Sequence, residues 1–375
     1  MTDRQKINIL FHIDSLNGGG AEKVLRTLVN NMDQTEFDIT VSTVFPDEAA
    51  TLLNSGIRYK AIYTANNKFN NLLYRIEAAL GLVYRFHLKD NYDIECAYLE
   101  NGATKIIASS TNKRAKKLAW VHCDFNVAIK DKDKYISKTL SWYKKYDRIV
   151  CVSEQCKKSI DEMYGLESKT VVLHNVVDSE EIIRKSKECL PKNVVKDGFT
   201  VCLVGRLTPP KKILRLLKAH KKLLEDGIKN NVWILGEGEE RSIIEKYIED
   251  NNLSSSVTLY GFQPNPYPFM CAADLLVCSS IYEGYSTFIT EGVILGKPIV
   301  ATNCSGTKDI LGESEFGIVT ENDDDAFYRG ILTALSVPKT KLDELAAKSY
   351  LRGKDFSTKA MVRENADFFA KLSEA

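Results

Sequence analysis

Several classes of protein are excluded by what this sequence lacks. The formal net charge over 375 residues is only +1, so no overall positive field points to nucleic acid. No stretch approaches the ~20 apolar residues that a membrane-spanning helix needs. The apolar run near the N-terminus is too short for a signal peptide. We therefore expect a cytoplasmic protein.

The chain also lacks the spacings of disulfide and metal sites. Its nine cysteines form no C-x-x-C pair, several lie in apolar runs, and their number is odd, which is typical of reduced, buried thiols. No His/Cys cluster has metal-ligand spacing, and no Ser-His-Asp or Cys-His set is suggested. The acidic segments at 131–133 and 323–325 precede helix-like stretches, where negative charge favours the helix dipole. We expect neither a metal nor another cofactor.

Strand-like and helix-like segments alternate along the whole chain, which predicts an α/β fold with parallel sheets flanked by helices. Because a single core rarely grows beyond ~250–300 residues, we expect two doubly wound domains, residues 1–180 and 198–355, with a linker near 180–197. The last residues, 356–375, have helical spacing and should pack back on the first domain. The strand-like segments are 6–13, 37–45, 92–99, 117–123, 147–153, 170–176, 199–207, 231–238, 257–262, 274–280 and 298–303.

The stretch YEGYSTFITEGVILGKP (282–298) follows one of these strands. Ser286 is a candidate N-cap for a helix of about ten residues, and Gly296 and Pro298 fit its end. Free N–H groups at such a helix N-terminus form a ready anion site, typically for phosphate. The stretch therefore predicts a strand, a tight turn and a short helix that receives an anion.

Two glutamates flank this predicted anion site. Glu283 lies in the turn, and Glu291 lies little more than one helical turn in, where its side chain would lean toward the N-terminus. Carboxylates accept hydrogen bonds from pairs of sugar hydroxyls, so the arrangement suits a sugar, a phosphate and a second sugar, as in a nucleotide sugar. The alternative is one glutamate that favours the dipole and one that is solvated, and this stretch alone leaves both open.

Two cations follow another strand. Gly205 ends it, and Arg206 and Lys211 come next on a proline-stiffened loop, which suits a diphosphate because Arg grips two oxygens as a fork and Lys neutralises a point charge. An ordinary solvated basic loop is the alternative. After the next strand, GEGEER (236–241) places Gly236 and Glu237 where a backbone could approach a base or ribose, although a two-glycine turn alone is weak.

The first half carries two further candidates. Gly18, Gly19 and Gly20 leave a side-chain-free loop before a helix N-terminus, where an anion or sugar could bind. The G-x-G-x-x-G spacing of dinucleotide binding is absent. His122 ends a strand-like segment, where a lone histidine is more often structural than functional.

Taken in order, these motifs resemble the retaining glycosyltransferases of family 4, which have the GT-B fold of two Rossmann-like domains facing a cleft. The likeness covers nearly the whole chain. It rests on GGGAEKVL, WVHCDF, VCVSE, HNVVD, VGRLTPPKK, GEGEER and the run from Ser280 to Glu291 followed by GKPIVATNCSG.

The resemblance implies a role for each candidate residue. Glu283 would face the donor sugar hydroxyls, and Glu291 would face the ribose. Arg206 and Lys211 would hold the donor phosphates and stabilise the departing nucleotide, with His122 beside the donor sugar. The glycines at 19 and 20 would border the diphosphate and acceptor. The backbone that would meet the diphosphate comprises Gly284, Tyr285, Ser286 and Thr287.

Three positions depart from the family pattern. Gly292 replaces an alanine, Lys212 replaces a glycine, and Ser286 stands where proline is frequent. None removes a functional side chain, so the departures bear on donor choice more than on activity.

The resemblance further implies a metal-independent hexosyl transfer with retention, from a UDP-sugar rather than a GDP-sugar. The acceptor would be a polyprenyl-diphosphate-linked saccharide at the inner face of the membrane, in surface polysaccharide or capsule synthesis. Two alternatives stay open. A non-catalytic accessory subunit would usually have lost the glutamates or the cation pair, whereas a nucleotide-sugar epimerase or a phosphorylase would release no UDP.

A basic region suggests peripheral contact with that membrane. Residues 105–158 hold fourteen Lys/Arg against five Asp/Glu, an excess of +9, and interleave them with aromatic residues. Within them, 133–148 could form a basic helix that lies at an anionic bilayer surface. Alternatively, its aromatic side chains pack onto the first domain and its lysines are solvated. The side chains concerned are Trp120, Phe125, Tyr135, Ile136, Leu140, Trp142, Tyr143 and Tyr146.

Overall fold

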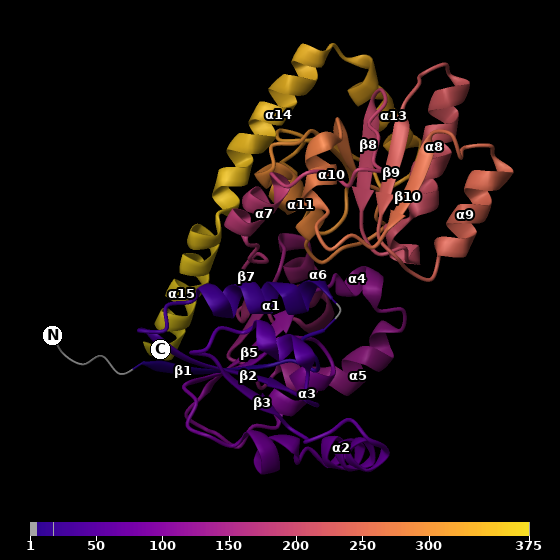
Figure 1. The fold of residues 1–375 in the computed structure, drawn as a ribbon. Coiled ribbons are helices and arrows are strands. Elements are labelled where there is room, and N and C mark those ends of the chain that lie inside the picture. The colour runs from indigo at the N-terminus through magenta and orange to yellow at the C-terminus, as the bar shows by residue number, and fades with distance from the viewer. Residues whose placement is uncertain (1–5, 18, 375) are drawn as a thin grey trace. The chain divides into compact units, whose positions relative to one another are not determined.

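The computed structural model describes residues 6–17 and 19–374 (Figure 1). The chain divides into two compact units, one made of Met1–Val176 with Thr358–Ala375 and the other of Val177–Ser357. Each unit is built on one parallel sheet flanked by helices, so the predicted α/β class with two doubly wound sheets is confirmed.

The first unit has a seven-stranded sheet in the order β3-β2-β1-β4-β5-β6-β7. From β1 the chain steps outward to β3 and then returns to β4, so the strand order reverses between β1 and β4. At such a switch point the loops leave the carboxyl ends of neighbouring strands in opposite directions, which opens a crevice there. The strands are β1 (Ile7–His12), β2 (Phe37–Thr43), β3 (Arg58–Ala61), β4 (Ile94–Ala97), β5 (Lys116–Val121), β6 (Arg148–Cys151) and β7 (Thr170–Val172).

Helices connect these strands, and the last helix of the chain returns to this unit. Phe369 of that helix is fully buried, with its ring 5.7 Å from the ring of Phe11 on β1 and 6.3 Å from that of Trp120 on β5. The helical segments are α1 (Gly20–Asn31), η1 (Glu48–Leu52), α2 (Lys68–Leu80), η2 (Tyr84–Leu88), α3 (Gly102–Ala108), α4 (Phe125–Ala128), α5 (Lys132–Tyr143), α6 (Glu154–Tyr164) and α15 (Thr358–Glu374).

The second unit repeats the plan with six strands in the order β10-β9-β8-β11-β12-β13, and its order reverses between β8 and β11. Its strands are β8 (Thr200–Val204), β9 (Asn231–Leu235), β10 (Val257–Gly261), β11 (Leu275–Cys278), β12 (Ile299–Thr302) and β13 (Ile318–Thr320). Its helical segments are α7 (Ser179–Ser186), η3 (Pro209–Lys211), α8 (Ile213–Glu225), α9 (Arg241–Asp250), α10 (Tyr267–Ala272), α11 (Thr287–Ile294), α12 (Thr307–Leu311), α13 (Asp324–Ser336), α14 (Lys339–Gly353) and η4 (Lys354–Phe356).

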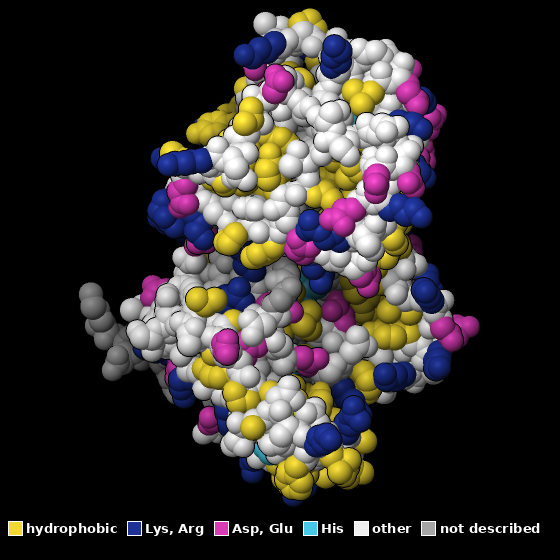
Figure 2. Space-filling view, turned by 45° about the vertical axis from the view of Figure 1, so that its right-hand side comes forward, with side chains coloured by type: hydrophobic (Ala, Val, Ile, Leu, Met, Phe, Trp, Pro, Cys, Tyr) yellow, Lys and Arg dark blue, Asp and Glu magenta, His cyan; other side chains and the backbone are white. Residues whose placement is uncertain are grey.

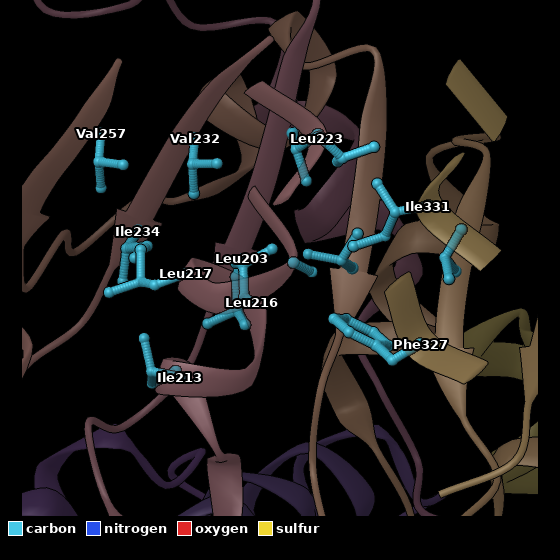
Figure 3. Close-up of a cluster of buried hydrophobic side chains, with 14 of the residues drawn as sticks. Leu203, Ile213, Leu216, Leu217, Leu223, Val232, Ile234, Val257, Phe327 and Ile331 are labelled. Atoms are coloured by element: carbon cyan, nitrogen blue, oxygen red, sulfur yellow. The ribbon is translucent and has the colours of Figure 1, made fainter. Parts of the chain in front are cut away.

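The core of the second unit lies between its sheet and the helices α8, α9 and α13. Leu203 of β8 and Ile234 of β9 meet Leu216 of α8, and Phe327 and Ile331 enter from α13 (Figure 3). These strands are apolar along their length because parallel strands flanked by helices are buried on both faces. The core thus fixes the strand ends from which the candidate site loops leave.

Two strands and one helix depart from the prediction. The strands β3 and β13 were not predicted, because both are short edge strands, and β3 reads RYKA with no apolar run. The predicted linker begins with the helix α7, which packs against α10 and α11. Only Ser179 and Ile182 of its eight residues are buried, so the helix shows no clear apolar stripe in sequence.

Four aromatic residues of the basic region pack inside the first unit. Trp120, Phe125, Tyr143 and Tyr146 are at most 2% exposed, and the ring of Tyr143 lies 4.9 Å from that of Tyr164 on α6. Packing therefore accounts for these four side chains, whereas Tyr135, Ile136, Leu140 and Trp142 of the predicted basic helix are only half-buried, so a bilayer contact there stays a prediction. Part of α5 packs within its own unit, because the helix lies against α3 and α6. Among the described residues, no helix is both long and apolar enough to cross a bilayer.

Candidate active site

The turn before α11 has the local structure that its sequence predicted. Ser286 is the N-cap of α11, and its Oγ accepts a hydrogen bond from the backbone N–H of Ile289 at 3.4 Å. The chain leaves the helix at Gly296, whose φ of 64° is a left-handed conformation that glycine adopts without strain. The helix is eight residues long rather than about ten. Its first-turn N–H groups start at Thr287, which is half-buried.

Lys211 and Glu283 form an ion pair at the start of this turn. The Nζ of Lys211 lies 2.5 Å from Oε1 of Glu283, and the Oγ of Ser280 donates to the same oxygen at 2.6 Å. Burial alone would lower the pKa of Lys211, but the charge of Glu283 and its hydrogen bond raise that pKa above the ordinary value. Lys211 is therefore a cation at neutral pH. A small depression beside β8 and β11 is lined in part by Lys211, Ser280, Glu283 and Ser286.

Glu291 is set back in α11 and is 8% exposed. Its Oε1 accepts a hydrogen bond from the hydroxyl of Tyr267 at 3.1 Å, which holds the carboxylate in one orientation. Tyr267 is the first residue of α10 and was not predicted as a site residue, because it lies 24 residues from Glu291 in an unremarkable NPYP run. A buried carboxylate with one oriented oxygen is suited to accept hydrogen bonds from a diol.

Arg206 is exposed and follows Gly205 at the carboxyl end of β8. The neighbouring GEGEER turn supports this loop. A Cβ on Gly236 would lie 1.9 Å from the carbonyl oxygen of Gly205, and one on Gly238 would lie 2.3 Å from that of Leu207. The two glycines therefore permit close packing of the turn on the loop. Glu237, also predicted to contact the donor, pairs with Arg241.

A buried arginine, not predicted from the sequence, ties the site loops together. Arg215 of α8 is 5% exposed, and its Nη1 donates to the carbonyl oxygen of Ser279 at 3.2 Å and to Oδ1 of Asn322 at 2.7 Å. Asn322 in turn donates from Nδ2 to the carbonyl oxygen of Ile281 at 2.7 Å. The Oγ of Ser279 donates to the carbonyl oxygen of Lys211 at 2.8 Å. This network fixes both ends of the Lys211–Glu283 pair. Arg215 lies in a helical run of mixed residues, so no sequence signal marks it.

The remaining predicted residues lie in the first unit. His122 follows β5, its backbone N–H donates to Oε1 of Glu100 at 2.5 Å, and its ring lies 5.0 Å from that of Tyr98. Burial lowers the pKa of His122 to about 3, so its imidazole is neutral at physiological pH. Gly19 is the N-cap of α1 and Gly20 its first residue, and a Cβ on Gly20 would meet open space. Gly18 lies outside the described residues.

The structure thus brings three predicted residues of the second unit, Lys211, Glu283 and Ser286, around one depression, whereas His122, Gly19 and Gly20 belong to the first unit. Lys211, Glu283 and the N-terminus of α11 are adjacent, which places cationic charge and free N–H groups in one depression. Within residues 6–17 and 19–374, no three His, Cys, Asp or Glu side chains are placed to hold a metal ion. Such an arrangement can bind a diphosphate and stabilise negative charge that develops on it.

Two family models match the chain, one after the other. The model described as Glycosyltransferase Family 4 matches residues 18–181, and the model described as Glycosyl transferases group 1 matches residues 185–350. Together they cover nearly the whole chain, and they meet close to the point where the structure divides into its two units.

Curated relatives resemble the chain at modest identity. The N-acetylgalactosamine-N,N'-diacetylbacillosaminyl-diphospho-undecaprenol 4-alpha-N-acetylgalactosaminyltransferase of Campylobacter jejuni is 24% identical over 96% of this chain and 98% of that protein. The UDP-Gal:alpha-D-GlcNAc-diphosphoundecaprenol alpha-1,3-galactosyltransferase of Escherichia coli is 24% identical over 84% of each chain. An uncharacterised glycosyltransferase of Methanocaldococcus jannaschii is 31% identical, but the match spans only 61% of this chain and 57% of that protein.

Solved structures share the fold over almost the full length. HepE of Anabaena in complex with UDP and glucose has a TM-score of 0.76 at 18% identity, covering 97% of this chain and 99% of that one. Sucrose-phosphate synthase of Thermosynechococcus elongatus has a TM-score of 0.79 at 16% identity, covering 98% and 99%. These likenesses show the GT-B fold.

Proposed function

We propose that this chain, which belongs to the glycosyltransferases of group 1 and family 4, moves a sugar from a UDP-sugar to a hydroxyl of a polyprenyl-diphosphate-linked saccharide. Transfer would retain the α-configuration and need no metal. The observation that carries the proposal is the Lys211–Glu283 pair beside the N-terminus of α11.

The second unit supplies what a nucleoside diphosphate leaving group needs. As the bond between sugar and diphosphate breaks, negative charge grows on the phosphate oxygens. Lys211, Arg206 and the first-turn N–H groups of α11 would stabilise that charge, because fixed dipoles and cations require no reorganisation during the reaction. Glu291, oriented by Tyr267, would accept hydrogen bonds from the ribose hydroxyls.

Glu283 would face hydroxyls of the donor sugar. In the free protein it is engaged by Lys211 and Ser280, so donor binding would exchange part of these contacts for contacts with the sugar and phosphate. His122, a neutral imidazole, would contribute a hydrogen bond near the sugar rather than a charge. With both glutamates occupied by hydroxyls, neither Glu283 nor Glu291 would be free to act as a nucleophile. Retention would follow from front-face attack, with a donor phosphate oxygen accepting the proton of the acceptor hydroxyl.

The relatives support the choice of donor and acceptor. The names of the Campylobacter and Escherichia coli proteins specify diphospho-undecaprenol acceptors, and the second also specifies UDP-galactose. The Anabaena structure contains UDP. On this basis we favour UDP-sugars over GDP-sugars as donors. The acceptor would belong to the synthesis of a surface glycan such as capsule. The protein would be cytoplasmic and would work at the inner face of the membrane.

The test is incubation of the purified protein with a panel of UDP-sugars and GDP-mannose, with and without a polyprenyl-diphosphate-linked saccharide. We expect release of UDP that depends on the acceptor, a product one sugar heavier by mass spectrometry, an α-linkage by NMR, and no loss of rate in EDTA. Conversion of the donor sugar without UDP release would instead identify an epimerase. Absence of turnover with every donor and acceptor, in a protein that still binds UDP, would favour an accessory subunit.

A further inference from the structure

The helix α2 of the first unit presents an apolar stripe to solvent. Its stripe residues recur at intervals of three and four, which places them on one side of the helix. A second exposed aromatic ring, Phe86, follows on η2. The exposed fractions are 72% for Phe69, 59% for Leu72, 49% for Ile76, 66% for Leu80 and 59% for Phe86. Exposed apolar residues are common singly, but a contiguous set on one helix indicates an interaction surface.

The opposite side of α2 already has its partners in the unit. Tyr74 packs edge-on against Tyr63 at a ring distance of 6.0 Å. Glu77 is buried and accepts a hydrogen bond from the Tyr63 hydroxyl at 2.7 Å, and Nε2 of His87 lies 2.7 Å from the same oxygen. Glu77 is the carboxylate of α2, so its inward position removes negative charge from the exposed side. The exposed stripe therefore lies on a different face of α2 from the one that packs within the unit.

The exposed charges around the stripe are almost all positive. Lys68 and Arg75 lie on α2, and Arg85 and Lys89 follow it, whereas Asp90 is the one exposed carboxylate between residues 66 and 90. In Figure 2, hydrophobic and Lys/Arg side chains gather at the lower end of the view, where α2 lies in Figure 1. A second copy of this surface would be repelled by the same four cations, but an anionic surface would be attracted to them.

We propose that α2 and η2 dock on an anionic lipid bilayer. In this arrangement the rings of Phe69 and Phe86 and the aliphatic stripe enter the acyl boundary, and the four cations meet lipid phosphates. An amphipathic helix with aromatic residues on one face and cations beside it binds in this way, and each further cation near an anionic surface strengthens binding. The membrane contact is thus assigned to α2, whose apolar stripe is exposed, rather than to α5, which lies against α3 and α6 and whose Tyr143 is buried.

This inference deepens the proposed function, since a lipid-linked acceptor would bring the protein to a bilayer. Binding to a bilayer can be tested without any acceptor, so the docking surface and the proposed reaction can fail separately. Full-length protein is sedimented with vesicles of phosphatidylcholine alone or with phosphatidylglycerol. We expect binding that requires phosphatidylglycerol and weakens as salt screens the surface charge.

Two pairs of matched variants locate the contact. Phe69→Ser should weaken vesicle binding by about tenfold, the loss expected for one large apolar side chain. Phe262→Ser removes a phenylalanine of nearly the same exposure, 71%, in the second unit and should leave binding unchanged. Lys68→Glu with Arg75→Glu should abolish the dependence on anionic lipid, whereas Lys134→Glu with Lys138→Glu on α5 should not.

Thermal melting checks that each variant is folded, and each is exposed enough that we expect no large change. Equal losses for Phe69→Ser and Phe262→Ser would overturn the proposal, as would binding that ignores lipid charge. A stripe that instead mediates self-association would appear as a dimer in light scattering that Phe69→Ser converts to monomer, which would also overturn it. If vesicle binding behaves as expected while no sugar is transferred to any acceptor, the docking surface stands and the proposed reaction fails.

Discussion

The ammonium group of Lys211 lies 2.5 Å from a carboxylate oxygen of Glu283, although 72 residues separate the two in the chain. In the free protein each charge compensates the other inside a partly buried depression. A diphosphate that binds there would compete with Glu283 for the cation. This competition determines whether a substitution of either residue is expected to raise or lower the affinity for a diphosphate.

Removal of either cation should reduce turnover far more than stability. We expect Lys211→Ala and Arg206→Ala each to lower kcat by roughly 10²–10³, the cost of losing charge stabilisation of a leaving group. Lys229→Ala, which removes an exposed lysine elsewhere in the second unit, is the control. Steady-state kinetics decide the matter, and normal kcat in both variants would contradict the site assignment.

The two glutamates should differ in kind. Glu291→Gln should weaken binding of free UDP, because its carboxylate is assigned to the ribose, and Tyr267→Phe should weaken it by a smaller factor of the same sign. Glu283→Gln should preserve or strengthen UDP binding, since it releases Lys211, while it damages sugar transfer. Calorimetry with UDP tests the difference, and equal losses of affinity in both glutamate variants would reject it.

Arg215 should act as a positioning residue. Arg215→Lys keeps a charge but cannot reach the Ser279 carbonyl and Asn322 together, so the turn that carries Glu283 should loosen. We expect kcat to fall by about tenfold with little change in UDP affinity. Asn322→Ala should reproduce the loss, because it removes the second anchor of the same turn. A fall in melting temperature without any change in kcat would show that the network is only structural.

Lys212 should be a local source of strain. Its φ of 51° is left-handed, which a residue with a Cβ adopts at a cost of about 1 kcal/mol. Lys212→Gly should therefore raise the free energy of unfolding by up to about 1 kcal/mol. Lys218→Gly, the same change inside α8, should lower it by about 1 kcal/mol. Urea denaturation of both variants measures the contrast, and a lower stability for Lys212→Gly would contradict this explanation.

Stability should fall in acid partly through His122. Its pKa drops from 6.5 to about 3 on folding because of burial, so between these values the unfolded chain binds more protons than the folded one. The contribution is fully present above pH 6.5 and is lost as the pH falls toward 3. His122→Gln should flatten the loss of unfolding free energy between pH 7 and pH 5. Parallel slopes for both proteins in urea melts at these pH values would count against it.

The sequence by itself determined the alternation of strands and helices, the Ser286 cap and the position of each motif at a strand end. These depend on neighbours along the chain: apolar runs that can be buried on both faces, a hydroxyl three residues before a free N–H, and a glycine at a helix end. The short edge strands β3 and β13 were not predicted, because β3 reads RYKA without an apolar run and β13 is only three residues long.

Only the tertiary structure decided which side chains meet. The contacts of Lys211 with Glu283, of Tyr267 with Glu291 and of Arg215 with Asn322 join segments far apart in the chain, so no spacing predicts them. The sequence also did not determine which apolar helix faces are buried. The aromatic side of α5 and the apolar stripe of α2 have similar patterns in sequence, yet the first is packed against α3 and α6 and the second is exposed. An amphipathic pattern predicts that a helix has one apolar face. Only the packing of the other elements decides whether that face is buried within the protein.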